Sequence, residues 1–137
     1  DSGRLEGKLK QAHSGEHAQC IFADGAVGRG IDDAVAAQAS VEVGKSYTFS
    51  AWTYAVSEDG DGYIDRKVGI DPMGGLDPKS PNIVWSEPRA KVETWERQSV
   101  SAVAQSRVIT VFAHALTTRI NGDKDYFFVD DAELSSQ

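Results

Sequence analysis

Apolar and polar residues alternate with a period of two along most of the chain. Between residues 34 and 43 the odd positions are all apolar, whereas the even positions include Gln38, Ser40 and Glu42. Successive side chains of a strand point to opposite faces, so this alternation predicts a strand with one buried face. Alanine is a good helix former, but unbroken alternation does not produce the apolar stripe of a helix.

The same pattern recurs in segments that are separated by turn-forming residues. The segment from Tyr47 to Val56 is the strongest predicted strand, because β-branched and aromatic residues dominate it. The sequence therefore predicts an all-β sandwich of jelly-roll type with about eight to ten antiparallel strands and no helix. Further strands are expected near residues 5–9, 18–22, 34–43, 67–70, 83–85, 99–104, 109–115 and 126–134.

Length and charge limit the classes of protein that fit this pattern. The chain has 137 residues, enough for one domain with a core and too few for two ordinary ones, so we expect a single domain over residues 1–137. Its formal net charge of −7 argues against nucleic-acid binding and against anionic lipid surfaces, which both require basic residues. No segment approaches the roughly 18 apolar residues of a membrane span. Because the sequence begins at Asp1 without an initiator methionine, we expect it to be cut from a longer protein or to be processed.

Few residues of the chain are suited to catalysis. A single cysteine, Cys20, excludes an internal disulfide and a thiolate zinc cage. His13, His17 and His114 are scattered and have no Ser or Cys motif near them. A glycosidase needs two carboxylates placed across a cleft, and such domains are seldom this small. We therefore expect a protein that is not an enzyme.

Four blocks of sequence carry a family resemblance through their order and spacing. They are residues 13–18, the turn and strand at 44–52, the strand residues 109–112, and the closing segment 126–134 with Val-Asp-Asp-Ala at its centre. Together they resemble the carbohydrate-binding modules of families 4, 9 and 22, and more broadly the galactose-binding-domain-like jelly rolls. Residues 69–78 are also similar to bacterial extracellular domains of this type.

This resemblance implies a non-catalytic module that binds a polysaccharide or oligosaccharide and targets an attached secreted enzyme or surface protein. It also implies an extracellular or cell-surface location, a bacterial source, a monomeric module within a multidomain protein, and a structural calcium ion. The alternative is a structural or adhesive β-sandwich of a bacterial surface protein that does not bind sugar.

Sugar binding needs flat aromatic groups for the C–H-rich face of a pyranose and polar groups for its hydroxyls. Trp52 and Tyr54 share one face of the strand at 47–56, opposite an apolar face, and are the first candidates. Burial of Trp52 under a loop is the alternative. Further candidates are Trp85, Trp95 and Tyr63, with Arg66, Arg89 and Gln98 as hydrogen-bonding groups.

Each of these further candidates also has a structural interpretation. Trp85 and Trp95 lie at strand ends, where aromatic residues often cap a core. Tyr63 lies in an acidic loop, where a solvated side chain is the simpler expectation.

Two acidic segments are candidates for calcium. By resemblance, Asp130 and Asp131 lie where carboxylates help to coordinate the ion, whereas the structural alternative is a bulge in which they bond backbone amides. The loop at residues 57–65 matches part of an EF-hand calcium loop, but the bidentate glutamate is missing because Val68 takes its position. We therefore expect residues 57–65 to form a flexible hairpin loop, with weak calcium binding there as the alternative. We favour Asp130 and Asp131 as the metal site.

Overall fold

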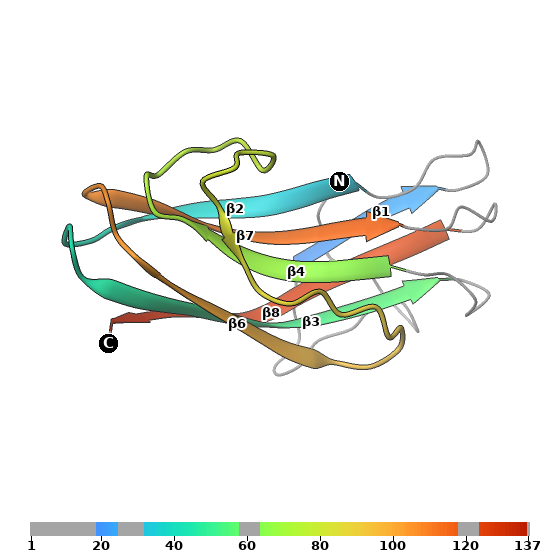
Figure 1. The fold of residues 1–137 in the computed structure, drawn as a ribbon. Coiled ribbons are helices and arrows are strands. Elements are labelled where there is room, and N and C mark those ends of the chain that lie inside the picture. Colours follow the sequence, from blue (N-terminus) through green and yellow to red (C-terminus); the bar gives the residue numbers. More distant parts are fainter. Residues whose placement is uncertain (1–18, 25–31, 58–63, 118–123, 137) are drawn as a thin grey trace.

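Two antiparallel sheets of four strands each face one another in this protein (Figure 1). The computed structural model describes residues 19–24, 32–57, 64–117 and 124–136. Those residues form no helix, and hence none that could span a membrane, so the prediction of an all-β sandwich is confirmed. The strands are β1 (Gln19–Asp24), β2 (Asp32–Ser40), β3 (Ser46–Ser57), β4 (Ile64–Asp71), β5 (Val84–Trp85), β6 (Glu96–Val103), β7 (Val108–Thr117) and β8 (Lys124–Ser136).

The chain passes repeatedly from one sheet to the other. Sheet A has the strand order β1-β8-β3-β6, and sheet B has the order β2-β7-β4-β5. Strands β3 and β4 belong to different sheets, so the expectation of a hairpin loop at residues 57–65 is wrong. Residues 58–63, which join β3 to β4 in the sequence, lie outside the described part.

The hydrophobic core lies between the sheets and follows the alternation of the sequence. On β3 the buried residues Tyr47, Phe49, Ala51 and Ala55 share the inward face, as predicted. Each large apolar side chain removed from water contributes about 1.5–3 kcal/mol to folding. Sheet B supplies Ile64, Val68, Ile70, Ile109, Ala113 and Ala115 from the opposite side.

A polar network crosses this core. Arg66 takes an inward position on β4 and is completely buried. Its Nε donates a hydrogen bond to Thr53 Oγ1 at 3.3 Å, and Thr53 Oγ1 donates to Gln98 Oε1 at 2.8 Å. Gln98 Nε2 in turn donates to the carbonyl oxygens of Arg66 at 2.8 Å and Glu87 at 3.0 Å. Arg66 and Gln98 therefore bond within the protein, and the prediction that they contact a sugar is wrong.

The buried guanidinium of Arg66 is only partly compensated. Its Nη1 donates to the carbonyl oxygen of Ile64 at 3.4 Å, whereas Nη2 has no hydrogen-bond partner. Burial lowers the pKa of Arg66 well below its ordinary value, to about 10, and the nearby carboxylates of Glu96 and Asp65 partly oppose this shift.

Candidate functional site

The candidate aromatic residues lie on two opposite outer surfaces of the sandwich. Trp52 and Tyr54 face outward from sheet A, as predicted, and Trp95 packs beside Tyr54 just before β6 begins. Trp85 lies in β5, in sheet B. All four side chains are partly exposed, so none is a fully buried core residue. The fifth candidate, Tyr63, lies outside the described residues.

The outer surface of sheet A carries a second apolar cluster. Tyr126 and Phe128 are buried there, and Tyr54 and Trp95 pack against them. The ring centroid of Tyr54 lies 5.2 Å from that of Trp95 and 6.0 Å from that of Phe128. Burial raises the pKa of Tyr54 above 10.0, and the negative charge of Glu93 adds to the shift. Much of the Tyr54 and Trp95 surface therefore contacts the protein itself.

Trp52 has a more polar setting on the same sheet. The strand register places it between Arg97 of β6 and Asp130 of β8. Arg97 Nη2 donates a hydrogen bond to Ser50 Oγ at 3.3 Å, one row further along β3. Trp52 thus lies in a row with one cationic and one anionic side chain. An aromatic ring and hydrogen-bonding groups therefore occur together here, as a sugar site requires.

Trp85 lies against the outer face of sheet B because a glycine leaves room for its ring. Strand β5 pairs with β4 so that Trp85 is opposite Gly69. A Cβ atom at position 69 would lie only 2.5 Å from Trp85 Cε3, so any other residue there would displace the ring. The ring centroid is 6.0 Å from that of Phe112, which is buried beside it.

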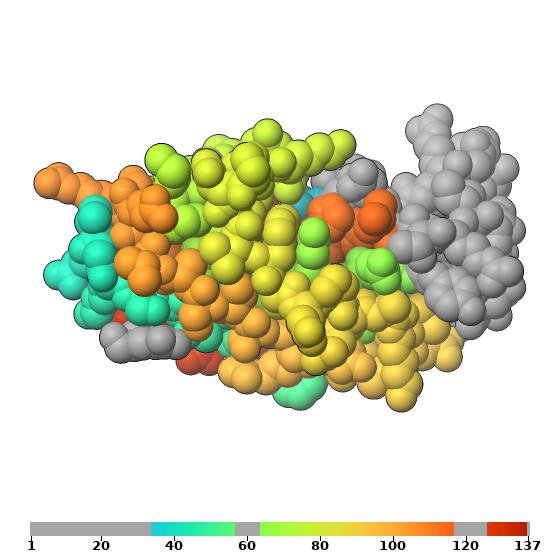
Figure 2. Space-filling model, viewed as in Figure 1, coloured from blue at the N-terminus to red at the C-terminus, as the bar shows by residue number. Residues whose placement is uncertain are grey.

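Polar side chains surround the Trp85 ring on the same face. Lys67 Nζ lies 4.2 Å from the ring centroid, in cation–π geometry, and the His114 ring centroid is 5.8 Å away. Lys67 and His114 are cross-strand partners on β4 and β7. In Figure 2 the segment that contains Trp85 covers part of β4, beside the residues at the end of β7.

A small cavity continues this surface away from Trp85. It has a volume of about 90 Å³ and can hold a few water molecules or one polar edge of a ligand. Together with Trp85, it offers an aromatic face, an ammonium group, an imidazole and a carboxylate on one surface. The cavity is lined by Asp65, Lys67, Pro88, His114 and Leu116.

The sequence did not indicate Lys67, Gly69 or His114 as part of a sugar-binding surface. They lie on outward positions of β4 and β7, and the alternation of each strand assigns them to a common face only once the pairing of β4 with β7 is known. The pairing joins segments that are far apart in the sequence.

Asp130 and Asp131 form a β-bulge on β8. Ser50 pairs with Glu133 and Trp52 pairs with Asp130, so β8 has an extra residue at this point. Asp131 has a φ of 50°, and its amide donates to Asp130 Oδ1 at 2.8 Å. Within the described ranges, no group of three or more His, Cys, Asp or Glu residues could hold a metal. The bulge geometry matches the structural alternative, and calcium binding stays a prediction.

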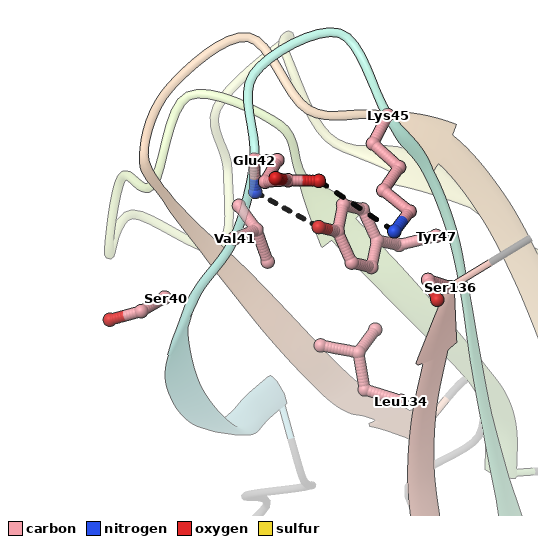
Figure 3. Close-up of a pocket in the computed structure, with 7 residues that line it drawn as sticks. All are labelled: Ser40, Val41, Glu42, Lys45, Tyr47, Leu134 and Ser136. Atoms are coloured by element: carbon pink, nitrogen blue, oxygen red, sulfur yellow. Dashed lines mark hydrogen bonds and ion pairs between the residues drawn. The ribbon is translucent and has the colours of Figure 1, made fainter.

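A wide hollow at one end of the sandwich lacks the features of a sugar site (Figure 3). Its volume is about 670 Å³, and it lies beside the turn between β2 and β3. The amide of Glu42 donates to the Tyr47 hydroxyl at 2.9 Å, and Lys45 Nζ lies 3.6 Å from Glu42 Oε2. These polar groups of the lining therefore bond one another. Tyr47 is the aromatic residue of the lining, and because it is largely buried it offers a sugar little surface.

A groove of about 360 Å³ is lined by β2 and β7 of sheet B and by β3 and β8 of sheet A. Its lining is mostly apolar and includes Val35, Phe49 and Val111, with Asp130 and Asp131 at its rim. It presents Phe49 and Phe112 from the sheets, both of which are buried, and no exposed aromatic ring. This groove therefore offers a pyranose no stacking surface.

Comparison with known proteins assigns a class of fold. No family model matches the chain, and no curated protein matches it. A family 61 carbohydrate-binding module in complex with β-1,4-galactotriose superposes with a TM-score of 0.61 at 15% identity, over 92% of this chain and 74% of that one. The C-terminal domain of EclA, a sugar-binding protein, gives 0.59 at 11% identity, over 98% and 89%.

The CBM22-2 xylan-binding domain from Paenibacillus barcinonensis Xyn10C gives a TM-score of 0.52 at 11% identity, over 93% of this chain and 83% of that one. At such identities the similarity establishes the fold alone. The chain therefore has the jelly-roll β-sandwich fold of carbohydrate-binding modules.

Proposed function

We propose that this protein is a non-catalytic carbohydrate-binding module whose sugar-binding surface is the outer face of sheet B. One observation carries the proposal: the partly exposed ring of Trp85 lies beside both Lys67 and His114. The fold supports it, because carbohydrate-binding modules share this sandwich.

The chemistry of this surface suits a pyranose. The indole of Trp85 offers an apolar face for stacking, while Lys67, His114 and Asp65 offer hydrogen-bonding groups for hydroxyls. These residues lie on paired strands and on β5, whose Trp85 packs against Gly69, so the backbone that carries the surface is already ordered before a ligand arrives. Such preorganisation reduces the entropy that binding costs.

The outer face of sheet A is the second candidate surface for the same function. Trp52 stands there between Arg97 and Asp130, and part of the Tyr54 and Trp95 rings remains exposed. Because Tyr54 and Trp95 also pack on buried aromatic residues, we rank this surface below the one at Trp85.

Two matched variants decide between the surfaces. Trp85→Ala is expected to abolish binding to soluble polysaccharides in affinity electrophoresis, and Trp52→Ala is expected to leave it within about threefold, since it removes no contact of that site. The opposite result moves the site to sheet A. If the unmodified protein binds none of a panel of plant, algal and host glycans, the proposed function is wrong.

A wider role follows from this proposal. The module targets an attached secreted enzyme or surface protein to polysaccharide, as a monomeric unit of a multidomain protein at the cell surface or outside the cell. A catalytic domain on the same chain supports targeting of an enzyme, and light scattering of the isolated chain tests whether it is monomeric.

A structural or adhesive sandwich without sugar binding is the alternative. The packing of Tyr54 and Trp95 onto Phe128 favours it, because aromatic residues on an outer face then serve stability. The glycan panel separates the two, since the alternative predicts no binding to any glycan.

We also propose that Asp130 and Asp131 contribute to a structural calcium site. The exposed position of Asp131 at a bulge supports this proposal. Carboxylates and backbone carbonyls can also supply the six to eight oxygen ligands that the ion takes.

A further inference from the structure

The ammonium group of Lys67 has an aromatic partner and no acidic one. Across the described part of the chain no carboxylate lies within 4.0 Å of Lys67 Nζ, whereas Lys45 pairs with Glu42 and Arg89 pairs with Glu87. The contact of Lys67 is the Trp85 ring, at 4.2 Å. This is notable in a chain with 21 acidic and 14 basic residues, where a partner would be easy to provide.

The order of side chains along β4 gives this cation a defined place. Asp65, Lys67 and Gly69 occupy successive outward positions, and Gly69 is opposite Trp85. Alternate residues of a strand are about 6.6 Å apart, so Lys67 separates Trp85 from Asp65. A sugar stacked on Trp85 therefore meets the ammonium of Lys67 before it meets the carboxylate of Asp65.

We infer that the Trp85 surface selects an acidic sugar, a uronic acid unit of a polysaccharide, whose carboxylate pairs with Lys67. This inference rests on the proposed function, since it names the class of glycan for the same surface. The carboxylate gains a charge-assisted hydrogen bond with an ammonium that has no carboxylate within 4.0 Å among the described residues. His114, the cross-strand neighbour of Lys67, offers a further hydrogen-bonding group on the same row.

The same residue discriminates against a neutral sugar. A pyranose that stacks on the Trp85 ring competes with Lys67 for the aromatic face, and a neutral sugar offers the displaced ammonium no anion in return. An acidic sugar offers the displaced ammonium its own carboxylate. Selectivity then arises from both an attractive and a repulsive contribution of one side chain.

The experiment compares polysaccharides that differ only in charge. Polygalacturonate, alginate and glucuronoxylan are each paired with a carboxyl-reduced form, in which the carboxylates are primary alcohols. Isothermal titration of the full chain is expected to show about tenfold tighter binding of at least one acidic form than of its reduced partner. Lys67→Met keeps the aliphatic stem and is expected to remove this preference, while Lys45→Met, which makes the same charge change at the end of the sandwich, keeps it.

Each outcome has a defined meaning. Equal or tighter binding of the reduced forms overturns the inference and leaves the proposed function standing. A preference that survives in Lys67→Met, or that is lost equally in Lys45→Met, also overturns it, because the carboxylate is then recognised elsewhere or by overall charge. Absence of binding to every glycan, acidic or neutral, overturns the proposed function itself. Unchanged thermal unfolding of both variants shows that the comparison is between folded proteins.

Discussion

Thr53 of sheet A and Arg66 of sheet B are joined through the core by a 3.3 Å hydrogen bond between two fully buried side chains. Gln98 extends the connection, because its amide group bonds Thr53 Oγ1 and the carbonyl oxygens of Arg66 and Glu87. Glu87 follows Trp85 by two residues, so this network ties the segment that carries the candidate site to both sheets.

Replacing Gln98 with alanine is expected to lower the free energy of unfolding by about 2–3 kcal/mol, because it removes a buried amide group that bonds Thr53 Oγ1 and the carbonyl oxygens of Arg66 and Glu87. Urea denaturation measures the change. Ser99→Ala, at the next and exposed position of β6, is the control and is expected to change stability by less than about 0.5 kcal/mol. A similar effect of both substitutions contradicts the role of the network.

Arg66→Met tests the cost of the buried guanidinium. At pH 7 the variant is expected to be as stable as the unmodified protein or more stable, because an incompletely bonded charge is removed while volume is kept. The pKa of Arg66 is lowered to about 10 in the folded state, below its ordinary value, so the charged form is disfavoured by folding. Its cost is complete below pH 10 and is relieved as the pH rises above about 10.

The free energy of unfolding of Arg66→Met, relative to that of the unmodified protein, is therefore expected to fall by about 1 kcal/mol between pH 8 and pH 11. Urea denaturation of both proteins at the two pH values provides the measurement. An advantage that grows with pH contradicts the lowered pKa.

Gly69→Ala is expected to displace the Trp85 ring, because the new Cβ would lie 2.5 Å from Trp85 Cε3 and 2.8 Å from Ile83 Cγ2. We expect a loss of about 1–3 kcal/mol in stability from overpacking. We also expect weaker glycan binding, with an altered tryptophan emission spectrum. Unchanged emission and affinity would show that Trp85 does not depend on this glycine.

The hydroxyl of Tyr54 is expected to ionise above its ordinary pKa of 10.0, because burial and Glu93 disfavour the phenolate. A raised folded-state pKa means that the stabilising contribution is complete below pH 10 and is lost as pH rises through the folded-state value. The difference between ultraviolet titrations of the unmodified protein and Tyr54→Phe isolates this group. Ionisation at or below pH 10 would contradict the packing of Tyr54.

Calcium is expected to raise the melting temperature, and a chelator to lower it. A micromolar site at millimolar calcium adds about 4 kcal/mol of stability. Asp131→Gly separates the two roles of the bulge, since Asp131 has a φ of 50° that glycine adopts without strain. If the bulge is only structural, Asp131→Gly is expected to be slightly more stable than the unmodified protein. Calcium is then expected to change the melting temperature of neither protein. A calcium site predicts a response that Asp131→Gly diminishes.

The sequence by itself determined which face of β3 enters the core and that Trp52 and Tyr54 lie on the other. This was possible because the period of two is a local property of an extended chain. It also determined the all-β class, since every long periodic segment has this period.

The tertiary structure alone decided which of these residues meet. Strand β5 has two residues, too few for a pattern, and its pairing with β4 places Trp85 on Gly69 and beside Lys67. Arg66 enters the core because its position shares the parity of Ile64 and Val68, although a charged residue is ordinarily expected outside. Strand pairing and register join segments that are distant along the chain. The packing of the two sheets against each other determines which pairing and register form.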